Sequence, residues 1–385
     1  MKRASLLAAA AFLASFAMAP AHAAEPLKIG FISTLSGPGA ALGQDLLDGF
    51  NLGIEHAGGT LGGRTVQLVV GDDQLKPDVG RQLAERMIQR DRVDLIAGVV
   101  FSNVMMAVAK PIFDSRTFMV SLNAGPSELA GKRCSPYFFN VAWQNDQSHE
   151  AMGKHVKDQG FKRVYLMAPN YPAGKDALTG FKRYYSGGEI IGEVYTQINQ
   201  PDYAAELAQL RAAKPDAVYI FYPGGMGVNL VRQYAQAGLT DRVPFLSAFT
   251  VDETNLPAQQ AAAEGMYSGA TWTPDMDTPG NAEFVAAFEA KNINPEGYTL
   301  YTYAAIQAWK DAVEAAGSLD FAAVVEALNT GTFQTVLGEV TLHDQTMSST
   351  FKTGQYRDGV VVGLSPRDNE GAAGIVIPKP AWPTR

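Results

Sequence analysis

Two groups of small residues, each directly after an apolar run, have the composition of an anion-binding site. The apolar runs span 93–100 and 117–122. The groups that follow them are Phe101, Ser102 and Asn103, and Asn123, Ala124 and Gly125. Each group opens a segment with a helical pattern, so a hydroxyl, side-chain amides and backbone N–H groups would face the same point. This chemistry holds a carboxylate without a metal or a nucleophile.

The two apolar runs predict the elements that bring these groups together. They are near-continuous rather than alternating, which is typical of parallel strands buried on both faces. In an open α/β sheet, ligands bind outside the carboxyl ends of the strands. We therefore expect both groups to lie side by side at a ligand-binding edge.

Metal and disulfide chemistry have little support. Besides His22, the chain has four histidines and one cysteine, namely His56, His149, His155, His343 and Cys134. The spacing between the two central histidines puts them on different faces of a helix, so solvated or locally bonded histidines are expected. There is no Gly-x-Ser-x-Gly elbow and no phosphate-binding loop that ends in Lys-Ser or Lys-Thr.

An imperfect dinucleotide fingerprint is the nearest enzyme-like signal. Gly37, Gly39 and Gly43 follow the first expected strand, and Asp72 and Asp73 close the second. The last glycine comes one residue late, and a proline removes a backbone donor where the pyrophosphate would bind. An exported enzyme with a nucleotide cofactor remains a distant alternative; we expect no enzyme and no cofactor. Adjacent carboxylates point to opposite faces of a strand, which favours capping over acid–base work.

Composition and the first residues indicate an exported protein. Lys2 and Arg3, an apolar stretch over 6–18 and a small-x-small site at Ala23 predict a signal peptide over 1–23, cleaved near Ala23 on the way to the periplasm. The net charge of −8 over 385 residues, with no basic block, argues against nucleic acid as a partner.

Beyond the leader, strand and helix patterns alternate, which predicts βαβ units and parallel sheets. A connector over 143–146 interrupts the alternation, and the pattern then restarts. A restart after a connector indicates a second sheet rather than a longer first one. The length is suited to about two domains.

Seven segments in order carry a family resemblance. They are LKIGFISTLSGPGAALGQDLLDGFNLGIE, GGTLGGRTVQLVVGDDQLKPD, DLIAGVVFSN, SLNAGPSEL, NYPAGKDALTGFK, DAVYIFYPGGMGVNLVRQYAQAGL and AAEGMYSGATW. The chain resembles the extracytoplasmic solute-binding proteins of ABC importers, branched-chain amino acid (leucine/isoleucine/valine-binding) type. The resemblance covers nearly all of the chain after the leader.

The resemblance implies a type I periplasmic binding protein fold of class α/β, in which two doubly wound lobes close over a ligand. Lobe I would comprise 24–142 plus 271–349, and lobe II 143–270 plus 350–385. The three hinge crossovers would lie near Ala142–Trp143, Ala270–Thr271 and Ser349–Thr350. The implied partners are ABC permease membrane subunits, and we expect a monomer.

The resemblance also implies roles for individual residues. Ser102, Ala124 and Gly125 match the positions that hold the ligand carboxylate, although Ser102 also suits a plain helix N-cap. Tyr171 matches an aromatic position of the second lobe, and the next aromatic position falls at or next to Tyr222, with core packing as the alternative for each. The expected ligand-binding set is completed by Leu42 at an aromatic position of the first lobe, by Phe101, Asn103 and Asn123 in the two loops, and by Phe249.

The departures from the family pattern point to the ligand. Phe249 stands where amino-acid binders carry an acid for the ligand ammonium, and an unpartnered charge in a closed site is costly. The second acid of the family maps to Gln144–Asp146 with its register open, so Asp146 remains a candidate. We expect a small carboxylate without an ammonium, an aromatic or phenyl-alkanoic acid. A receptor for branched-chain or other amino acids or amides, and a sensory module of the same fold, are the alternatives.

Overall fold

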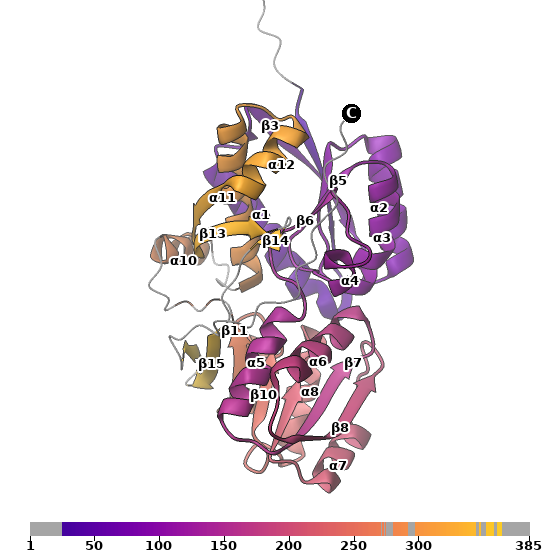
Figure 1. Ribbon diagram of the computed structural model, residues 1–385, viewed down its shortest axis with the longest axis vertical. Coiled ribbons are helices and arrows are strands. Elements are labelled where there is room, and N and C mark those ends of the chain that lie inside the picture. The colour runs from indigo at the N-terminus through magenta and orange to yellow at the C-terminus, as the bar shows by residue number, and fades with distance from the viewer. Residues whose placement is uncertain are drawn as a thin grey trace, which may run out of the picture.

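The computed structural model describes residues 25–270, 272, 274, 280–291, 297–343, 346–347, 352–357 and 360–363. These residues form two α/β lobes, each built on its own sheet and stacked along the long axis of the molecule (Figure 1). The expected signal peptide lies outside the described residues. None of the described helices is long and apolar enough to span a membrane.

The upper lobe in Figure 1 contains a nine-stranded sheet in the order β12-β13-β14-β6-β5-β4-β1-β3-β2. Its centre is parallel, because β1 pairs in parallel with β3 and β4, and β5 with β4 and β6. The strands are β1 (Leu27–Ser33), β2 (Thr60–Leu61), β3 (Arg64–Asp72), β4 (Leu95–Gly98), β5 (Phe118–Ser121), β6 (Phe138–Asn140), β12 (Thr332–Thr335), β13 (Gly338–His343) and β14 (Thr346–Met347). The helices of this lobe are α1 (Ala40–His56), α2 (Pro77–Arg86), α3 (Ser102–Asp114), α4 (Ser127–Ala130), α10 (Asn281–Ala290), α11 (Gly297–Ala316) and α12 (Phe321–Thr330).

The lower lobe contains a seven-stranded sheet in the order β16-β15-β11-β10-β9-β7-β8. Its strands are β7 (Arg163–Pro169), β8 (Glu189–Thr196), β9 (Ala217–Ile220), β10 (Phe245–Ala248), β11 (Tyr267–Ala270), β15 (Lys352–Arg357) and β16 (Val360–Gly363). Its helices are α5 (Gln147–Asp158), α6 (Pro172–Tyr184), α7 (Ala204–Ala213), α8 (Gly225–Gln236) and α9 (Leu256–Gln259).

The chain passes between the sheets three times, after β6, after β11 and after β14. This topology accords with two doubly wound lobes joined by three crossovers. The first passage includes Ala142 and Trp143. The other expected hinge residues, Thr271, Ser349 and Thr350, lie outside the described residues, and the lobe boundaries stay a prediction.

The two apolar runs form the expected parallel strands, but the first strand is shorter than its run. All four residues of β4 and all four of β5 are buried. Val99 has a φ of +66°, a left-handed conformation that takes the chain out of the sheet one residue after β4. Helix α3 then begins at Ser102 itself, which brings its first N–H groups to the sheet edge.

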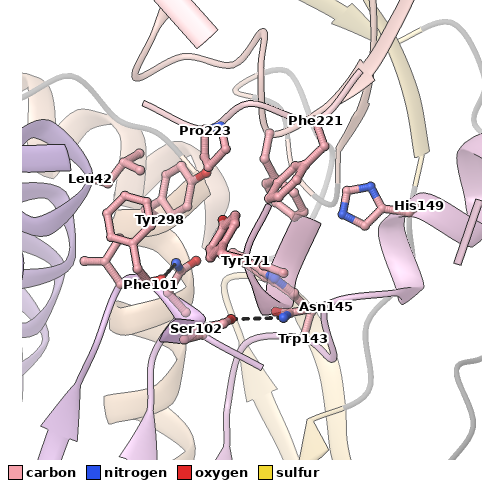
Figure 2. Close-up of a pocket in the computed structure, with 15 residues that line it drawn as sticks. Leu42, Phe101, Ser102, Trp143, Asn145, His149, Tyr171, Phe221, Pro223 and Tyr298 are labelled. Atoms are coloured by element: carbon pink, nitrogen blue, oxygen red, sulfur yellow. Dashed lines mark hydrogen bonds between the residues drawn. The ribbon is translucent and has the colours of Figure 1, made fainter. Parts of the chain in front are cut away.

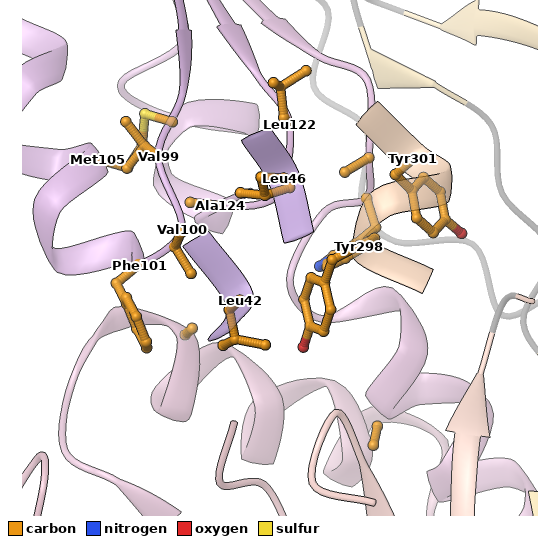
Figure 3. Close-up of a cluster of buried hydrophobic side chains, with 14 of the residues drawn as sticks. Leu42, Leu46, Val99, Val100, Phe101, Met105, Leu122, Ala124, Tyr298 and Tyr301 are labelled. Carbon is orange, nitrogen blue, oxygen red and sulfur yellow. The ribbon is translucent and has the colours of Figure 1, made fainter. Parts of the chain in front are cut away.

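Apolar side chains from several elements pack beneath this edge (Figure 3). They come from α1, from the ends of β4 and β5 with the first turns of α3, and from the start of α11. The labelled members are Leu42, Leu46, Val99, Val100, Phe101, Met105, Leu122, Ala124, Tyr298 and Tyr301. This packing fixes the loops that face the lower lobe.

Candidate functional site

A pocket lies between the two lobes at the carboxyl ends of the central strands (Figure 2). Its empty space is about 400 Å³, including the part that opens to solvent. Fifteen residues line it: Leu42, Val100, Phe101, Ser102, Asn123, Ala124, Trp143, Asn145, His149, Tyr171, Ala173, Phe221, Pro223, Phe249 and Tyr298. None of these described lining residues carries a charged side chain of either sign.

Seven of the ten expected ligand-binding residues meet in this pocket. They are Leu42, Phe101, Ser102, Asn123, Ala124, Tyr171 and Phe249. Asn103, Gly125 and Tyr222 lie outside the lining. The loops after β4 and β5 are joined directly, since Asn123 Nδ2 donates to the Val100 carbonyl at 2.6 Å.

The side chain of Tyr222 points away from the pocket, because successive side chains of this segment alternate in direction. Its hydroxyl is 2.9 Å from Thr196 Oγ1, its ring packs edge-on against Tyr203 at 5.3 Å, and it is fully buried. Successive residues of an extended segment face opposite sides. Its neighbour Phe221 therefore lines the pocket, so the aromatic position expected at or next to Tyr222 falls on Phe221.

Gly125 allows the first crossover, which contains Trp143 and Asn145, to pack closely against the loop after β5. Its N–H donates to Asn145 Oδ1 at 3.0 Å, and a Cβ at this position would collide with the Trp143 carbonyl. The N–H of Ala124 likewise donates to the Val99 carbonyl at 3.2 Å. Both backbone donors expected for a carboxylate are thus engaged within the protein.

Ser102 supplies donors at the start of α3. It is the first residue of α3 rather than its N-cap, which is Phe101 and provides no side-chain cap. The first intrahelical bond runs from Met105 N to the Phe101 carbonyl at 3.0 Å, so the N–H groups of Ser102 and Asn103 are left for another acceptor. The helix start supplies partial positive charge at the same point.

The hydroxyl of Ser102 is oriented by Asn145. Asn145 Oδ1 accepts from the Gly125 N–H, which fixes the side-chain amide so that Nδ2 is the donor. Nδ2 lies 3.0 Å from Ser102 Oγ. Because Ser102 Oγ accepts this bond, its own hydrogen is available to a ligand oxygen.

Aromatic rings form the walls. Tyr171, the N-cap of α6, is nearly parallel to Phe221 at 6.3 Å and 11°, and lies 6.4 Å from Phe101 of the other lobe. Trp143 stacks on Phe249 at 4.7 Å and 22°. Burial, with the nearby charge of Asp176, raises the pKa of Tyr171, so its hydroxyl stays protonated and remains a donor.

Asp146, the candidate for an ammonium partner, is turned away from the pocket. It is buried, accepts from Gln144 Nε2 at 2.7 Å and pairs with Arg183 at 3.0 Å. Arg183 also pairs with Glu150, which is fully buried. The position next to the pocket is taken by the neutral Asn145.

Hydrogen bonds join the lobes on two sides of the pocket. Ser127 of α4 donates from its backbone N–H and its hydroxyl to Asp176 of α6, at 3.1 and 2.5 Å. Asn145 Nδ2 is also 3.0 Å from Asp176 Oδ2. On another side, Thr254 donates to Asp45 of α1 at 2.9 Å. The lobes are therefore in contact around the pocket.

The two carboxylates and the last glycine of the imperfect dinucleotide fingerprint have structural roles. Asp73 accepts from Thr34 Oγ1 at 2.6 Å and Asp72 from the Leu35 N–H at 2.9 Å, so both hold the loop after β1. A Cβ at Gly43 would collide with the Thr34 carbonyl. Among the described residues there is also no group of three or more His, Cys, Asp or Glu that could hold a metal ion.

Eight lining residues were not expected from sequence: Val100, Trp143, Asn145, His149, Ala173, Phe221, Pro223 and Tyr298. Trp143 and Asn145 lie in the segment identified as a connector, and Phe221 is next to an expected residue. Tyr298 comes from α11, far along the chain, and no local pattern indicates it.

A family model described as periplasmic binding protein matches residues 26–359. The chain belongs to the periplasmic binding protein family. Its type I fold and its kinship with solute-binding proteins of ABC transporters confirm the family and the fold that the sequence predicts.

Three relatives illustrate the range of ligands in this group. The Leu/Ile/Val-binding protein BraC3 of Rhizobium johnstonii is 29% identical over 92% of this chain and 97% of its own. A solute-binding protein from R. palustris in complex with benzoate has a TM-score of 0.84 and 28% identity, covering 90% of this chain and 96% of its own. Another, from Rhodopseudomonas palustris with 3,4-dihydroxybenzoic acid, has a TM-score of 0.83 and 25% identity, covering 91% and 98%.

Proposed function

We propose that this protein is an extracytoplasmic receptor that binds a small aromatic or phenyl-alkanoic carboxylate and delivers it to an ABC importer, without chemical turnover. The observation that carries the proposal is the pairing of an anion-binding helix start with an aromatic pocket that has no acidic lining residue among those described. The ligands of the two similar solved structures, benzoate and dihydroxybenzoate, support the same class.

In this proposal the carboxylate accepts from Ser102 Oγ and from the Ser102 N–H at the start of α3. Hydrogen bonds to a charged group are stronger than neutral ones, and the helix start compensates part of the charge. The ring of the acid lies among Phe101, Tyr171 and Phe221. A preformed, mostly apolar pocket with a few placed polar groups suits a small, rigid ligand.

A branched-chain amino acid receptor is the second candidate, because the curated relatives are named for leucine, isoleucine and valine. An amino-acid ligand carries an ammonium that needs an acceptor of negative charge. Two acids beside the lining, Asp146 and Asp176, are engaged by Arg183 and by Ser127 with Asn145. The geometry supports the aromatic acid over the amino acid.

Isothermal titration of the purified protein with benzoate, phenylacetate and leucine tests the proposal. We expect binding of at least one aromatic acid and no binding of leucine at comparable concentration. Leucine binding without a response to either aromatic acid would overturn it. The same titrations monitored for product by chromatography would reveal any turnover. The cleavage near Ala23 that goes with this role is checked by the mass of the protein from the periplasmic fraction.

A further inference from the structure

His149 is a buried polar residue at one side of the pocket that the proposed carboxylate contacts do not use. It lies in the first turn of α5 and is 1% exposed, yet it lines the pocket. Its Nδ1 is hydrogen-bonded to the hydroxyl of Tyr219. Tyr219 belongs to β9, is fully buried and stacks on Phe181 at 4.2 Å.

The direction of this hydrogen bond follows from the surroundings of Tyr219. In the described part of the chain, the Tyr219 hydroxyl has no other acceptor than His149 Nδ1. A buried hydroxyl hydrogen without an acceptor is costly, so Tyr219 donates and Nδ1 accepts. A neutral imidazole that accepts at Nδ1 carries its hydrogen on Nε2. Burial lowers the pKa of His149 to about 3, which keeps the ring neutral at physiological pH.

The imidazole lies on the opposite side of the pocket from Leu42 and Phe101, with Tyr171 and Phe221 between them (Figure 2). The ring meets Phe221 edge-on at 4.9 Å and Phe249 at 6.0 Å. Nε2 makes no hydrogen bond within the described residues, and His149 lines the pocket, so this donor is available to a ligand beside Phe221 and Phe249.

We propose that His149 selects the ligand by donating a hydrogen bond from Nε2 to a neutral oxygen on the ring, remote from the carboxylate. The preferred ligand is then a hydroxy-substituted aromatic monocarboxylate rather than an unsubstituted one. This inference rests on the proposed function. A single neutral donor suits a phenolic oxygen, whereas a second carboxylate would be buried with no cation among the described lining residues.

Matched ligands test the preference by titration. Benzoate is compared with 3- and 4-hydroxybenzoate and with 3- and 4-methylbenzoate, because a methyl group has nearly the size of a hydroxyl. At one ring position we expect the hydroxyl compound to bind about tenfold more tightly than the methyl compound, the size of one net hydrogen bond. Equal or tighter binding of both methyl compounds would overturn the inference.

Variants assign the preference to this side chain. His149→Asn keeps an oxygen near the place of Nδ1 for the Tyr219 hydroxyl and removes Nε2. The hydroxyl preference, taken as the ratio of hydroxyl to methyl affinity within each protein, should therefore fall to within about twofold. Tyr219→Phe leaves the ring in place but no longer fixes its tautomer, so the preference should weaken. His155→Asn, on the same helix and outside the lining, is the matched control and should behave as wild type.

The outcomes separate this inference from the function on which it rests. If no aromatic acid binds, the proposed function fails. If aromatic acids bind but the hydroxyl preference is absent, or persists in His149→Asn, only the role of His149 fails. Nitrogen NMR of the ligand-free protein with ¹⁵N-labelled histidine gives a check that needs no ligand and no variant. We expect His149 to be protonated on Nε2 alone, and the opposite tautomer would overturn the inference.

Discussion

Asn145 lies 3.0 Å from Ser102, with its Nδ2 donating to the serine Oγ, and this bond links the first crossover to the first turn of α3. The same Nδ2 is 3.0 Å from Asp176 of the lower lobe, and Oδ1 accepts from the Gly125 N–H. One side-chain amide therefore connects the hinge, the proposed anion site and the contact between the lobes. Four predictions follow from the residues around it.

Ser102→Ala removes the hydroxyl proposed to donate to the ligand carboxylate. Hydrogen bonds to charged groups contribute about 1.5–3 kcal/mol, so affinity for an aromatic acid should fall about 10- to 100-fold. Isothermal titration measures the change. Ser115→Ala is the control at the other end of α3, where Oγ donates to the Ile112 carbonyl, and should leave affinity unchanged. Equal affinity of Ser102→Ala and wild type would remove Ser102 from the site.

Asp176→Asn weakens the contact between the lobes at a residue that does not itself line the pocket. Asp176 accepts two hydrogen bonds from Ser127 and one from Asn145, and burial raises its pKa. An asparagine amide accepts fewer of them, so closure should be less favourable. Affinity for every ligand should fall by a similar factor, about 5- to 10-fold, with the order of ligands unchanged.

Titration of Asp176→Asn with benzoate and the hydroxybenzoates measures the loss of affinity for each ligand and the order of their affinities. Asp158→Asn is the control, because its ion pair with Lys154 is on the surface of α5. A changed order of ligands in Asp176→Asn would mean that this carboxyl acts on the ligand itself.

Sequence patterns predict the parts of this site that depend on single elements. The apolar runs ending before Ser102 and Asn123 give the buried parallel strands and the sheet edge where both residues lie. Only the fold distinguishes Tyr222 from Phe221, since an offset of one residue in an extended segment exchanges its faces. Family matching defines such a position only to within a residue.

Other features depend on contacts between distant parts of the chain, which no local pattern encodes. Gly125 is expected to bind the ligand, but its lack of a side chain lets the Trp143 carbonyl approach. Tyr298 reaches the pocket from a helix of the last third of the sequence. His149 is expected to be locally bonded, and its partner Tyr219 agrees with that, but only the fold shows that the ring also faces the cavity.

Phe249→Asp places a carboxylate where amino-acid binders of the family carry one. Phe249 has a φ of +56°, a left-handed conformation that aspartate tolerates better than most residues. A negative charge in this pocket should repel an aromatic acid and lower its affinity by more than about tenfold. The same charge should allow measurable binding of leucine, which titration detects.

Phe249→Leu separates charge from ring packing in this experiment. It removes the stacking on Trp143 without adding charge, so it should weaken aromatic acids moderately and gain no response to leucine. If Phe249→Asp keeps wild-type affinity for aromatic acids, the position does not face the ligand and the argument from the missing acid is wrong.

The neutral state of His149 makes stability depend on pH in a defined window. Its pKa is about 3 in the folded protein because of burial, against about 6.5 in an unfolded chain. The unfolded state therefore binds a proton that the folded state does not, so stability is complete above pH 6.5 and falls as the pH decreases toward 3. The slope from this group is about 1.4 kcal/mol per pH unit.

Chemical denaturation of wild type and His149→Asn between pH 7 and pH 4.5 measures this slope. Burial also lowers the pKa of His155, so the wild-type curve contains both histidines and the difference between the two proteins isolates His149. The free energy of unfolding of wild type should fall more steeply than that of the variant below pH 6.5. Parallel curves would mean that His149 takes up a proton in the folded protein, in which case Nε2 would not remain the neutral donor that faces the pocket.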